Sequence, residues 1–561
     1  MISETTVESG IPPRTLIWRW VPGLAAVGSG LLAGLAFPWP GWSGLAWLAP
    51  ALLMGAGLGQ SGGRAFRLGY VAGLVQFLVS LRWLLLIPFP TGALAAWLAL
   101  GAYCALFWGA GLWLTLGWIR GLTGLPAAAS WEASARALAG LVWWRRAGVW
   151  LGAAALATGL EVVRGRAFSG FPWNFYGVTQ WENAPLIQVA SVTGIFGVTF
   201  LLHWVSLALF GALLQVQLSP RNRFSWTADL RLPLAVLLVL VGWGFRRVMH
   251  GAPQGPPVTL ALVQPSIPQT LIWDDAANPE RFTKVFELTR TALALQPDAL
   301  IWPEGSLPDI TEAQFEAVTG ETRKSGAWWF FGTGYGRLVE GRPEHYNAAL
   351  LVDANGRVVD RYHKRRLVIF GEYIPFERTL PFMKWLTPIG SSFTPGGQAG
   401  AFRFGPDTNT VASPVICFED LFPESTREHV TPETDFLLEL TNNGWFGESS
   451  AHWQHCAGAA LRAVENGVPL VRCANNGLTC WLDEFGRLRD LLGRKGSEYA
   501  PGVLITQVPR RAEGVPRPLT WYHRNGDVFG WSCVGVTGVL TGMVLRRRRA
   551  EKAAFDHGWR G

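Results

Sequence analysis

Charged residues are scarce in this chain. Only 16% of its 561 residues are Asp, Glu, Lys or Arg, against roughly 25% in ordinary soluble domains, whereas 49% are hydrophobic and 30 are tryptophan. This balance argues against a freely soluble globular protein and predicts a membrane protein. The formal net charge is +8, but the arginines occur in small separate groups without forming one basic face, so we expect no nucleic-acid partner.

Cysteine is also sparse, and its spacing argues against the usual cysteine-based sites. The six cysteines form neither a CxxC pair nor a dense framework, which disfavours zinc and a disulfide scaffold. Cys473 and Cys480 flank "ANNGLT" and could pair across a hairpin, but we expect both to be reduced and buried. In "HWQH", His452, His455 and Cys456 have helical spacing. No carboxylate or second cysteine pair completes a ligand set there, so no metal is expected.

Long apolar runs dominate much of the sequence. Several approach or exceed the ~20 residues that a helix needs to cross the hydrocarbon core, and flanking tryptophans extend the shorter ones. The first run lacks a clear cleavage site and is followed almost at once by another, so we expect it to be retained. The sequence predicts eight membrane spans, at residues 16–37, 44–58, 68–87, 92–119, 149–163, 186–214, 232–245 and 528–545.

The distribution of arginine predicts the orientation of these spans. Cationic side chains near span ends favour the cytoplasmic side, and arginines gather in alternate connections. Both termini are therefore expected in the cytoplasm, and the segment 251–527 on the outer face, despite the contrary charges of Arg246 and Arg247. In a bacterium that face is periplasmic. The arginines concerned are Arg64, Arg67, Arg136, Arg145, Arg146, Arg221, Arg223 and those at 546–549.

The segment 251–527 follows a different pattern. Short β-branched or aromatic runs such as "VTLALVQPSI", "DALIWPEG" and "DFLLELTNNG" end in Gly, Pro or Asn and are typical of buried strands. Helix-like stretches lie between some of them, and "VDANGRVV" and "LDEFGRL" indicate hairpin turns. This alternation predicts a layered α/β domain. We therefore expect residues 1–250 to hold seven spans, 251–527 the outer domain, and 528–561 the last span and a basic tail.

Three predicted strand ends in this domain carry reactive side chains. Cys417 closes the apolar run in "VASPVICFEDLFPE", where a cysteine is more often a core residue than a nucleophile. A nucleophile needs a base and a group that holds the developing oxyanion. Glu304 in "ALIWPEGS" is a candidate base. Lys364 in "DRYHKRRLVIFGEYIPFE" is a candidate for the second role, although a lone lysine is more often solvated.

The order of these motifs is more specific than any one of them. "WPE", then "YHK", then "CFEDLFPE" resembles the Glu, Lys and Cys triad of the nitrilase superfamily. One branch, the apolipoprotein N-acyltransferases, places such a domain between the seventh and eighth of eight spans, and the chain resembles this branch over nearly its full length. "VQPSIPQTLIWD", "FGEYIPFE", "SFTPGG", "TNNGWFG" and "CANNGLT" are similar to its motifs. The chain departs from it at Phe418, where the family often has tyrosine.

The resemblance implies an αββα sandwich beside a polytopic helical membrane domain, and a ping-pong acyl transfer without a cofactor. Cys417 would take an acyl chain as a thioester from a phospholipid, usually phosphatidylethanolamine. The free α-amine of an S-diacylglyceryl cysteine at the N-terminus of a lipoprotein would then accept it. Glu304 would act as general acid and base, and Lys364 with the backbone N–H of Phe418 would hold the oxyanion.

Further residues are expected to support this site. Glu372 and Glu419 match family positions and would orient Lys364 or the amine, although each taken singly is as readily explained as a solvated strand-end carboxylate. The apolar loop 373–393 either dips into the leaflet and gates lipid entry or packs the domain against the spans. The residues expected at the substrate or in this lid are Trp273, Phe376, Trp385 and Trp445.

Two other functions stay open from the sequence. A membrane-tethered nitrilase-type amidase would use the same triad on a small amide, but a single span would suffice to anchor it. A non-catalytic lipid-binding or transport scaffold would predict broken triad positions, and transport would favour internal repeats, which we do not find. The sequence favours a monomeric acyltransferase of the bacterial inner membrane, with a phospholipid donor and a lipoprotein acceptor.

Overall fold

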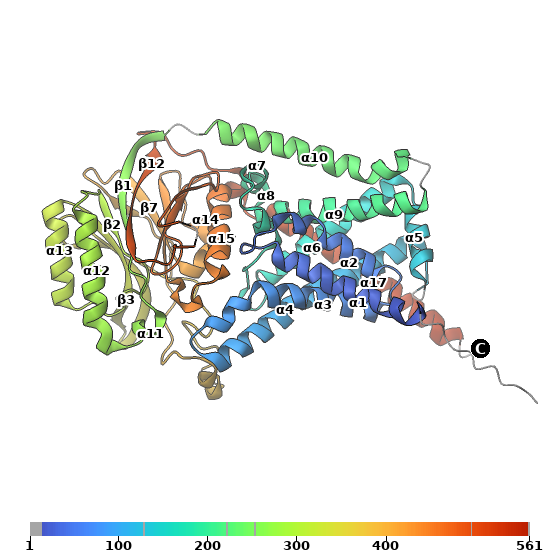
Figure 1. Cartoon of the computed structure of the whole chain (residues 1–561), viewed down its shortest axis with the longest axis horizontal. Coiled ribbons are helices and arrows are strands. Elements are labelled where there is room, and N and C mark those ends of the chain that lie inside the picture. The colour runs from blue at the N-terminus through green and yellow to red at the C-terminus, as the bar shows by residue number, and fades with distance from the viewer. Residues whose placement is uncertain are drawn as a thin grey trace, which may run out of the picture.

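The computed structural model describes residues 14–126, 129–219, 223–251, 254–377, 379–494 and 496–558. Its chain forms a helical bundle and a β-rich domain that lie side by side, and α17 returns from the domain into the bundle (Figure 1). The bundle contains α1 (Arg14–Leu35), α2 (Ala49–Gly57), α3 (Gly62–Ser80), α4 (Pro90–Thr123), α5 (Trp131–Ala139), α6 (Trp143–Arg164), α7 (Ala184–Ile187), α8 (Ala190–Thr193), α9 (Ile195–Leu218), α10 (Arg223–Met249) and α17 (Val528–Gly558).

Several bundle helices have the length and composition of membrane spans. Among the described residues, five such stretches are Pro90–Thr123, Trp143–Arg164, Ile195–Leu218, Thr227–Met249 and Val528–Ala554. The predicted span 44–58 instead forms a short 3-10 helix and the nine-residue α2, which is well below the ~20 residues of a span. Gly194, at φ +65°, interrupts the predicted span 186–214, so α9 begins at Ile195. A region of several apolar helices is confirmed, while the count of eight spans stays a prediction.

The end of the bundle remote from the β-rich domain collects arginines from different connections. Arg548 lies over the ring of Trp113, with 4.8 Å to its centroid, and Arg547 donates to the carbonyl of Leu125 at 3.0 Å. Arg146 forms a buried ion pair with Asp229 on α10. The C-terminal part of α17 and α5 lie at this same end (Figure 1). Arg221 lies outside the described residues.

The β-rich domain consists of two six-stranded sheets with helices on their outer faces. The first sheet has the order β12-β1-β2-β3-β4-β5 and the second β11-β10-β9-β8-β7-β6. Side chains from both sheets share one core between them. The strands are β1 (Gln254–Gln264), β2 (Ala299–Ile301), β3 (Trp328–Val339), β4 (Arg342–Val352), β5 (Val358–His363), β6 (Phe402–Phe404), β7 (Thr410–Ile416), β8 (Phe436–Thr441), β9 (Leu470–Ala474), β10 (Cys480–Leu482), β11 (Leu488–Leu491) and β12 (Gly502–Arg511).

The helices complete an αββα sandwich. α12 (Asn278–Leu293) and α13 (Glu312–Ser325) lie beside the first sheet, at the edge of the molecule, whereas α14 (Pro423–Glu428) and α15 (Ser450–Asn466) lie on the side of the bundle (Figure 1). The short helices α11 (Gln269–Ile272) and α16 (Trp521–Asn525) belong to connections. The helix-like stretches expected between strands, "ERFTKVFELTRTALAL", "EAQFEAVTGETRK" and "AHWQHCAGAALRAVENG", form α12, α13 and α15.

The predicted hairpin turns are also confirmed. "VDANGRVV" joins β4 to β5, and "LDEFGRL" joins β10 to β11. Each turn contains a glycine in the left-handed region, Gly356 at φ +80° and Gly486 at φ +77°, a conformation that costs other residues roughly 1–2 kcal/mol. The turn residues were therefore a sufficient local signal to predict these two hairpin connections.

α15 is the layer through which the domain meets the bundle. All its residues are buried, because it packs in one hydrophobic core with side chains of the second sheet and of the bundle helices. Alanines such as Ala457, Ala460 and Ala463 on this helix allow close approach. The helix that covers the second sheet is thus buried inside the whole molecule, and side chains on α15 can contact both the β-rich domain and the bundle.

Candidate active site

Cys417 lies on a strained turn directly after β7. Its φ is +51°, and such a left-handed conformation costs a non-glycine residue roughly 1–2 kcal/mol. The buried carboxylate of Glu419 holds the turn, since Oε2 accepts the N–H of Ile416 at 2.8 Å. Oε1 accepts the N–H groups of Arg365 and Arg366 at 2.6 and 3.0 Å. Glu419 therefore joins the nucleophile turn to the loop that follows β5.

Glu304 is held at the end of β2 by three hydrogen bonds. Its Oε1 accepts Lys364 Nζ at 3.0 Å and Asn347 Nδ2 at 2.7 Å, and its Oε2 accepts the N–H of Asn442 at 2.9 Å. Gly332 on β3 lies behind it, where an added Cβ would come within 2.7 Å of the Glu304 Cα. The carboxylate is thus buried and fixed in orientation, and a side chain at Gly332 would displace it.

Lys364 lies between two carboxylates directly after β5. Its Nζ donates to Glu304 Oε1 at 3.0 Å and to Glu372 Oε1 at 2.8 Å, and the side chain is only 1% exposed. Burial alone would lower the pKa of Lys364, but the charges of Glu304 and Glu372 outweigh it and raise that pKa well above its usual value. The lysine is therefore a fixed cation.

Glu372 completes the buried network. Asn347 Nδ2 bridges Glu304 and Glu372, with 2.8 Å to Glu372 Oε1, and Glu372 Oε2 accepts the N–H of Val368 at 2.8 Å. Glu372 thus orients Lys364 directly, whereas Glu419 reaches it only through the backbone of the next residues. The sequence predicted one shared role for these two carboxylates, and the structure separates them.

The thiol of Cys417 faces this network. Burial raises its pKa, the charge of Glu304 raises it further, and Lys364 opposes the rise. The thiol is therefore protonated at neutral pH and needs a proton acceptor when it reacts. Glu304 is the carboxylate whose charge acts on it most strongly.

A cavity of about 1160 Å³ joins these residues to the helical bundle. Glu304, Lys364, Glu372 and Cys417 form its polar wall. The opposite wall is apolar and comes from the bundle, with the residues Trp83, Leu84, Ile87, Phe89, Ala93, Ala96, Ala99, Leu100, Tyr103, Phe168, Phe171 and Trp173. The chamber thus places a nucleophile beside a surface suited to an alkyl chain.

Aromatic rings also line this chamber. The ring of Phe418 stacks on Trp173, at 6.4 Å between centroids, and meets Phe422 edge-on at 5.1 Å. Trp273 and Trp445 form another edge-to-face pair at 5.1 Å, and both line the cavity. Trp273 and Trp445, which the sequence predicted at the substrate or in the lid, thus line the cavity, and so does Phe418, which it predicted as a supporting residue.

Phe376 and Trp385 lie elsewhere. They are 70% and 81% exposed and do not line the cavity, although the stem of their loop does so through Tyr373, Ile374 and Ile389. Of the two places that the sequence offered for Phe376 and Trp385, at the substrate or in the lid, the structure has them in the loop 373–393 and outside the cavity lining. The tip of the loop instead presents its apolar side chains outward.

The sequence missed a second set of residues, which link the two halves. Gln454 on α15 accepts the indole N–H groups of Trp83 and Trp173, each at 3.0 Å, and Asn174 Nδ2 at 3.1 Å through a single oxygen. Its Nε2 donates to the Ser80 carbonyl at 3.0 Å. The buried amide thereby fixes two indoles that form the apolar wall. No local sequence signal marks these partners, because three segments far apart in the chain supply them.

Asn347 was also missed, although the sequence holds a signal for it. It is the polar residue in the strand "YNAALLV", whose other positions are largely apolar. A polar side chain inside a buried strand needs hydrogen-bond partners. Here the partners are the two carboxylates of the site.

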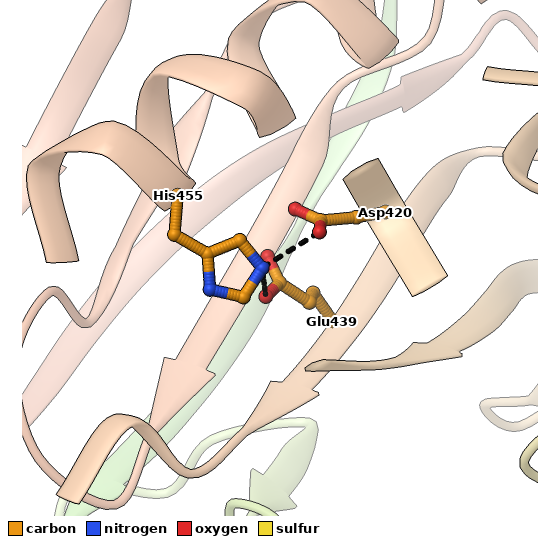
Figure 2. Close-up of side chains that lie close together, drawn as sticks. All are labelled: Asp420, Glu439 and His455. Atoms are coloured by element: carbon orange, nitrogen blue, oxygen red, sulfur yellow. Dashed lines mark hydrogen bonds and ion pairs between the residues drawn. The ribbon is translucent and has the colours of Figure 1, made fainter. Parts of the chain in front are cut away.

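A buried polar cluster supports the nucleophile turn from behind. Asp420, Glu439 and His455 converge with possible ligand atoms within 4.8 Å of one another (Figure 2). This corrects the argument that no carboxylate accompanies "HWQH": His455 Nε2 lies 2.7 Å from Asp420 Oδ1. His452 does not join the cluster and instead contacts the Gly447 carbonyl.

Arg472 supplies the positive charge of this cluster. It donates to Glu439 Oε2 at 2.6 Å and approaches His455 Nδ1 at 2.9 Å and Asp420 Oδ2 at 3.7 Å. Burial raises the pKa of Asp420 and of Glu439 to about 7 although Arg472 opposes the rise, and burial and Arg472 lower the pKa of His455 to about 3. The Arg472 guanidinium offsets part of the negative charge of the two carboxylates. His455 forms a hydrogen bond with the backbone of Cys417.

The remaining cysteines are free thiols. Cys480 lies near Cys456, with 3.9 Å between the sulfur atoms, whereas Cys473 points at the carbonyls of Val263 and Ile301. Both Cys473 and Cys480 are buried, and they are not paired across the hairpin.

Known proteins resemble the chain along nearly its whole length. Residues 29–208 match the family model of the apolipoprotein N-acyltransferase N-terminal domain, and residues 259–513 match that of carbon-nitrogen hydrolases. The apolipoprotein N-acyltransferase of Geobacter metallireducens is 33% identical over 529 residues, covering 94% of this chain and 95% of the relative. That of Bradyrhizobium diazoefficiens is 32% identical over 559 residues, covering 96% and 97%.

Among solved structures, an amidase of the nitrilase superfamily from Nesterenkonia covers 46% of this chain and 93% of its own, with 18% identity and a TM-score of 0.35. The first family model falls within the bundle, and the second covers most of the β-rich domain. The full-length relatives carry one and the same enzyme name. The chain therefore belongs to the apolipoprotein N-acyltransferase family, and its second half carries a carbon-nitrogen hydrolase domain.

Proposed function

We propose that this chain moves a fatty acyl group from a phospholipid, through a thioester on Cys417, to the α-amine of an S-diacylglyceryl cysteine at the N-terminus of a lipoprotein. One observation carries the proposal: a single cavity joins Cys417, Glu304 and Lys364 to an apolar wall made by the bundle. An amidase for small amides needs no such wall. The intact triad likewise argues against a non-catalytic scaffold.

In the first step, Cys417 Sγ attacks the ester carbonyl of the donor. Glu304 takes the thiol proton and then gives it to the departing glycerol oxygen. Lys364 Nζ and the backbone N–H of Phe418 stabilise the negative charge on the tetrahedral intermediate. The C–O bond breaks, lysophospholipid leaves, and the acyl group remains as a thioester. Phosphatidylethanolamine is the donor we propose.

In the second step, the lipoprotein amine attacks the thioester carbonyl. Glu304 accepts the amine proton and returns it to Cys417 Sγ, as the C–S bond breaks and the amide forms. Lys364 again stands near the developing charge, and Glu372 keeps its Nζ in place. Glu419 does not contact the reacting atoms in this proposal. It positions them, because its carboxylate holds the Cys417 turn and the loop after Lys364 together.

A site at the membrane suits both substrates. Exposing an acyl chain to water costs about 0.8 kcal/mol per CH₂, so a soluble enzyme would have to overcome this cost twice. The exposed Phe376, Phe382 and Trp385 would insert into the leaflet beside the cavity mouth. This placement gives the loop 373–393 a role in lipid entry, with Trp273 and Trp445 at the mouth itself.

The arrangement in the membrane is part of the same proposal. We place the protein in the bacterial inner membrane as a monomer with eight spans, divided at residues 250 and 527. The β-rich domain lies on the periplasmic side and both termini lie in the cytoplasm. The arginines gathered at the bundle end opposite the domain support this orientation.

Mass spectrometry of the intact full-length protein tests the proposal. The purified protein is incubated with phosphatidylethanolamine, and a diacylglyceryl lipopeptide is then added, with Cys417→Ser as control. We expect an added acyl mass on Cys417 that moves to the peptide amine. Discharge of the adduct to water alone, or no adduct at all, would favour the amidase interpretation.

A further inference from the structure

Two arginines directly after Lys364 reach the same cavity as the nucleophile. Arg365 and Arg366 both line it, together with Cys417 and Phe422. Their backbone N–H groups are bound to Glu419 at 2.6 and 3.0 Å. Since Glu419 also holds the turn of Cys417, the two guanidinium groups start from a backbone that is fixed relative to the reacting atoms.

Their ion pairs leave part of each guanidinium free to bind a ligand. Arg365 binds Glu428 at 2.6 Å through Nη2, while its Nη1 is buried and has no hydrogen-bond partner among the residues that the structure describes. A buried donor without a partner is costly, and Arg365 is among the residues that line the cavity.

The main contact of the Arg366 side chain is with the aromatic ring of Phe422. Its guanidinium lies over Phe422, with 5.1 Å to the ring centroid, and its closest carboxylate oxygen is on Glu424, at 3.8 Å. Glu424 lies nearer to Arg166, at 3.6 Å. The side chain of Arg366 is 44% exposed, and Arg366 is among the residues that line the cavity.

We propose that Arg365 and Arg366 bind the phosphodiester of the phospholipid donor while its ester lies at Cys417. This inference rests on the proposed function. In a glycerophospholipid the phosphate is only a few bonds from the ester oxygen, so its binding groups must lie beside the nucleophile in the same chamber. Arginine suits this ligand, because its planar fork can bind two phosphate oxygens.

The proposed phosphate site serves only the first half-reaction. The diacylglyceryl cysteine that accepts the acyl group carries no phosphate, and the lysophospholipid removes the phosphate when it leaves. The two arginines therefore favour phospholipid over a neutral ester with the same acyl chains, and they do not affect the transfer from Cys417 to the amine.

The test compares two donors that differ only in the phosphate headgroup. The rate of acyl addition to Cys417 in the full-length protein is measured in micelles by quenched-flow mass spectrometry, with dipalmitoyl phosphatidylethanolamine and with dipalmitoyl glycerol. In Arg365→Gln/Arg366→Gln we expect about tenfold to hundredfold slower acylation by the phospholipid, with the rate for the neutral donor unchanged. Arg366→Gln alone, which leaves the Arg365 ion pair intact, shows a smaller loss of the same kind.

A double variant on the neighbouring strand is the matched control. Arg357 and Arg361 are exposed, precede Lys364 and do not line the cavity, so Arg357→Gln/Arg361→Gln removes equal charge and keeps the wild-type preference. Equal losses with both donors, or no loss with either, would overturn the phosphate site.

Free phosphate is the other source of this chemistry. If the arginines bind inorganic phosphate itself, added phosphate changes the rate of acylation by dipalmitoyl glycerol in the wild type and not in Arg365→Gln/Arg366→Gln. The preference for phospholipid over dipalmitoyl glycerol is then the same in these two proteins. That outcome also overturns the proposal. A wild-type protein that forms no thioester with phospholipid would instead refute the proposed function.

Discussion

The two walls of the central cavity are built in opposite ways. The polar wall is a hydrogen-bonded network in which Glu304, Lys364 and Glu372 fix one another. The apolar wall is made of indoles and small side chains from the bundle, and Gln454 on α15 holds its two tryptophans. The domain thus provides the chemistry, the bundle provides the space, and one buried helix sets their relative position.

This difference makes the two walls respond differently to mutation. Losing a member of the polar network should slow both half-reactions whatever the length of the acyl chain. Changing the apolar wall should alter which chains fit and how firmly the halves are joined. The following variants sharpen the comparison, from the largest expected effect to the smallest.

Glu304→Gln should have the largest effect. The amide keeps the shape of the side chain but cannot accept the thiol or amine proton, and general acid–base catalysis contributes about 10²–10⁴-fold. We expect a loss of that size in the single-turnover rates of both half-reactions. Glu312→Gln, at an exposed position of α13, should behave as the wild type. A Glu304→Gln protein with normal rates would refute the role of this carboxylate.

Asn347→Ala should have the next largest effect. The change removes the donor that bridges Glu304 and Glu372, at 2.7 and 2.8 Å, and a hydrogen bond to a charged group contributes about 1.5–3 kcal/mol. We expect both half-reactions to slow by about tenfold to hundredfold, measured by the same assay. If the rates fall only for one acyl chain length, Asn347 acts on substrate fit and not on the polar network.

Gln454→Leu should break the link between the walls. The indole N–H groups of Trp83 and Trp173 would lose their buried acceptor, at about 1–3 kcal/mol for each unsatisfied group. We expect a lower thermal midpoint and a changed preference among donors of different acyl length. Gln454→Glu keeps the acceptor oxygen but loses the donor to the Ser80 carbonyl, so it should restore the preference only in part. A wild-type preference in Gln454→Leu would show that the apolar wall does not depend on this amide.

Trp385→Ala should have the smallest effect, and only where a bilayer is present. The residue is 81% exposed and lies outside the cavity lining, so chemistry in micelles should be unchanged. Loss of membrane contact by a large side chain, worth about 1.5–3 kcal/mol, should raise the KM for donor in vesicles. Leu338→Ala, on the β3–β4 hairpin and 76% exposed, is the matched control. An equal effect in micelles would mean that the loop acts on the site itself.

Sequence and structure agree best where a local signal exists. Each residue of the triad Cys417, Glu304 and Lys364 follows a predicted strand, and each of the two hairpins has a glycine in its turn. The triad and the hairpins could therefore be predicted from the sequence. At the predicted span 44–58 the structure has a short 3-10 helix followed by the nine-residue α2, a break that an average of hydropathy over the segment does not reveal. Trp83, Trp173 and Gln454 were inaccessible, since only tertiary packing brings them together.

The most direct test of the two-wall account asks where the acyl chain lies while its carbonyl is bound to Cys417. Phospholipid carrying a diazirine near the methyl end of its acyl chain is used to load Cys417, and the labelled peptides are mapped after irradiation. The account predicts labels in segments 83–103 and 168–173 of the apolar wall, and none there in Cys417→Ala. Labels confined to α10 or to the outward tip of the loop 373–393 would contradict it.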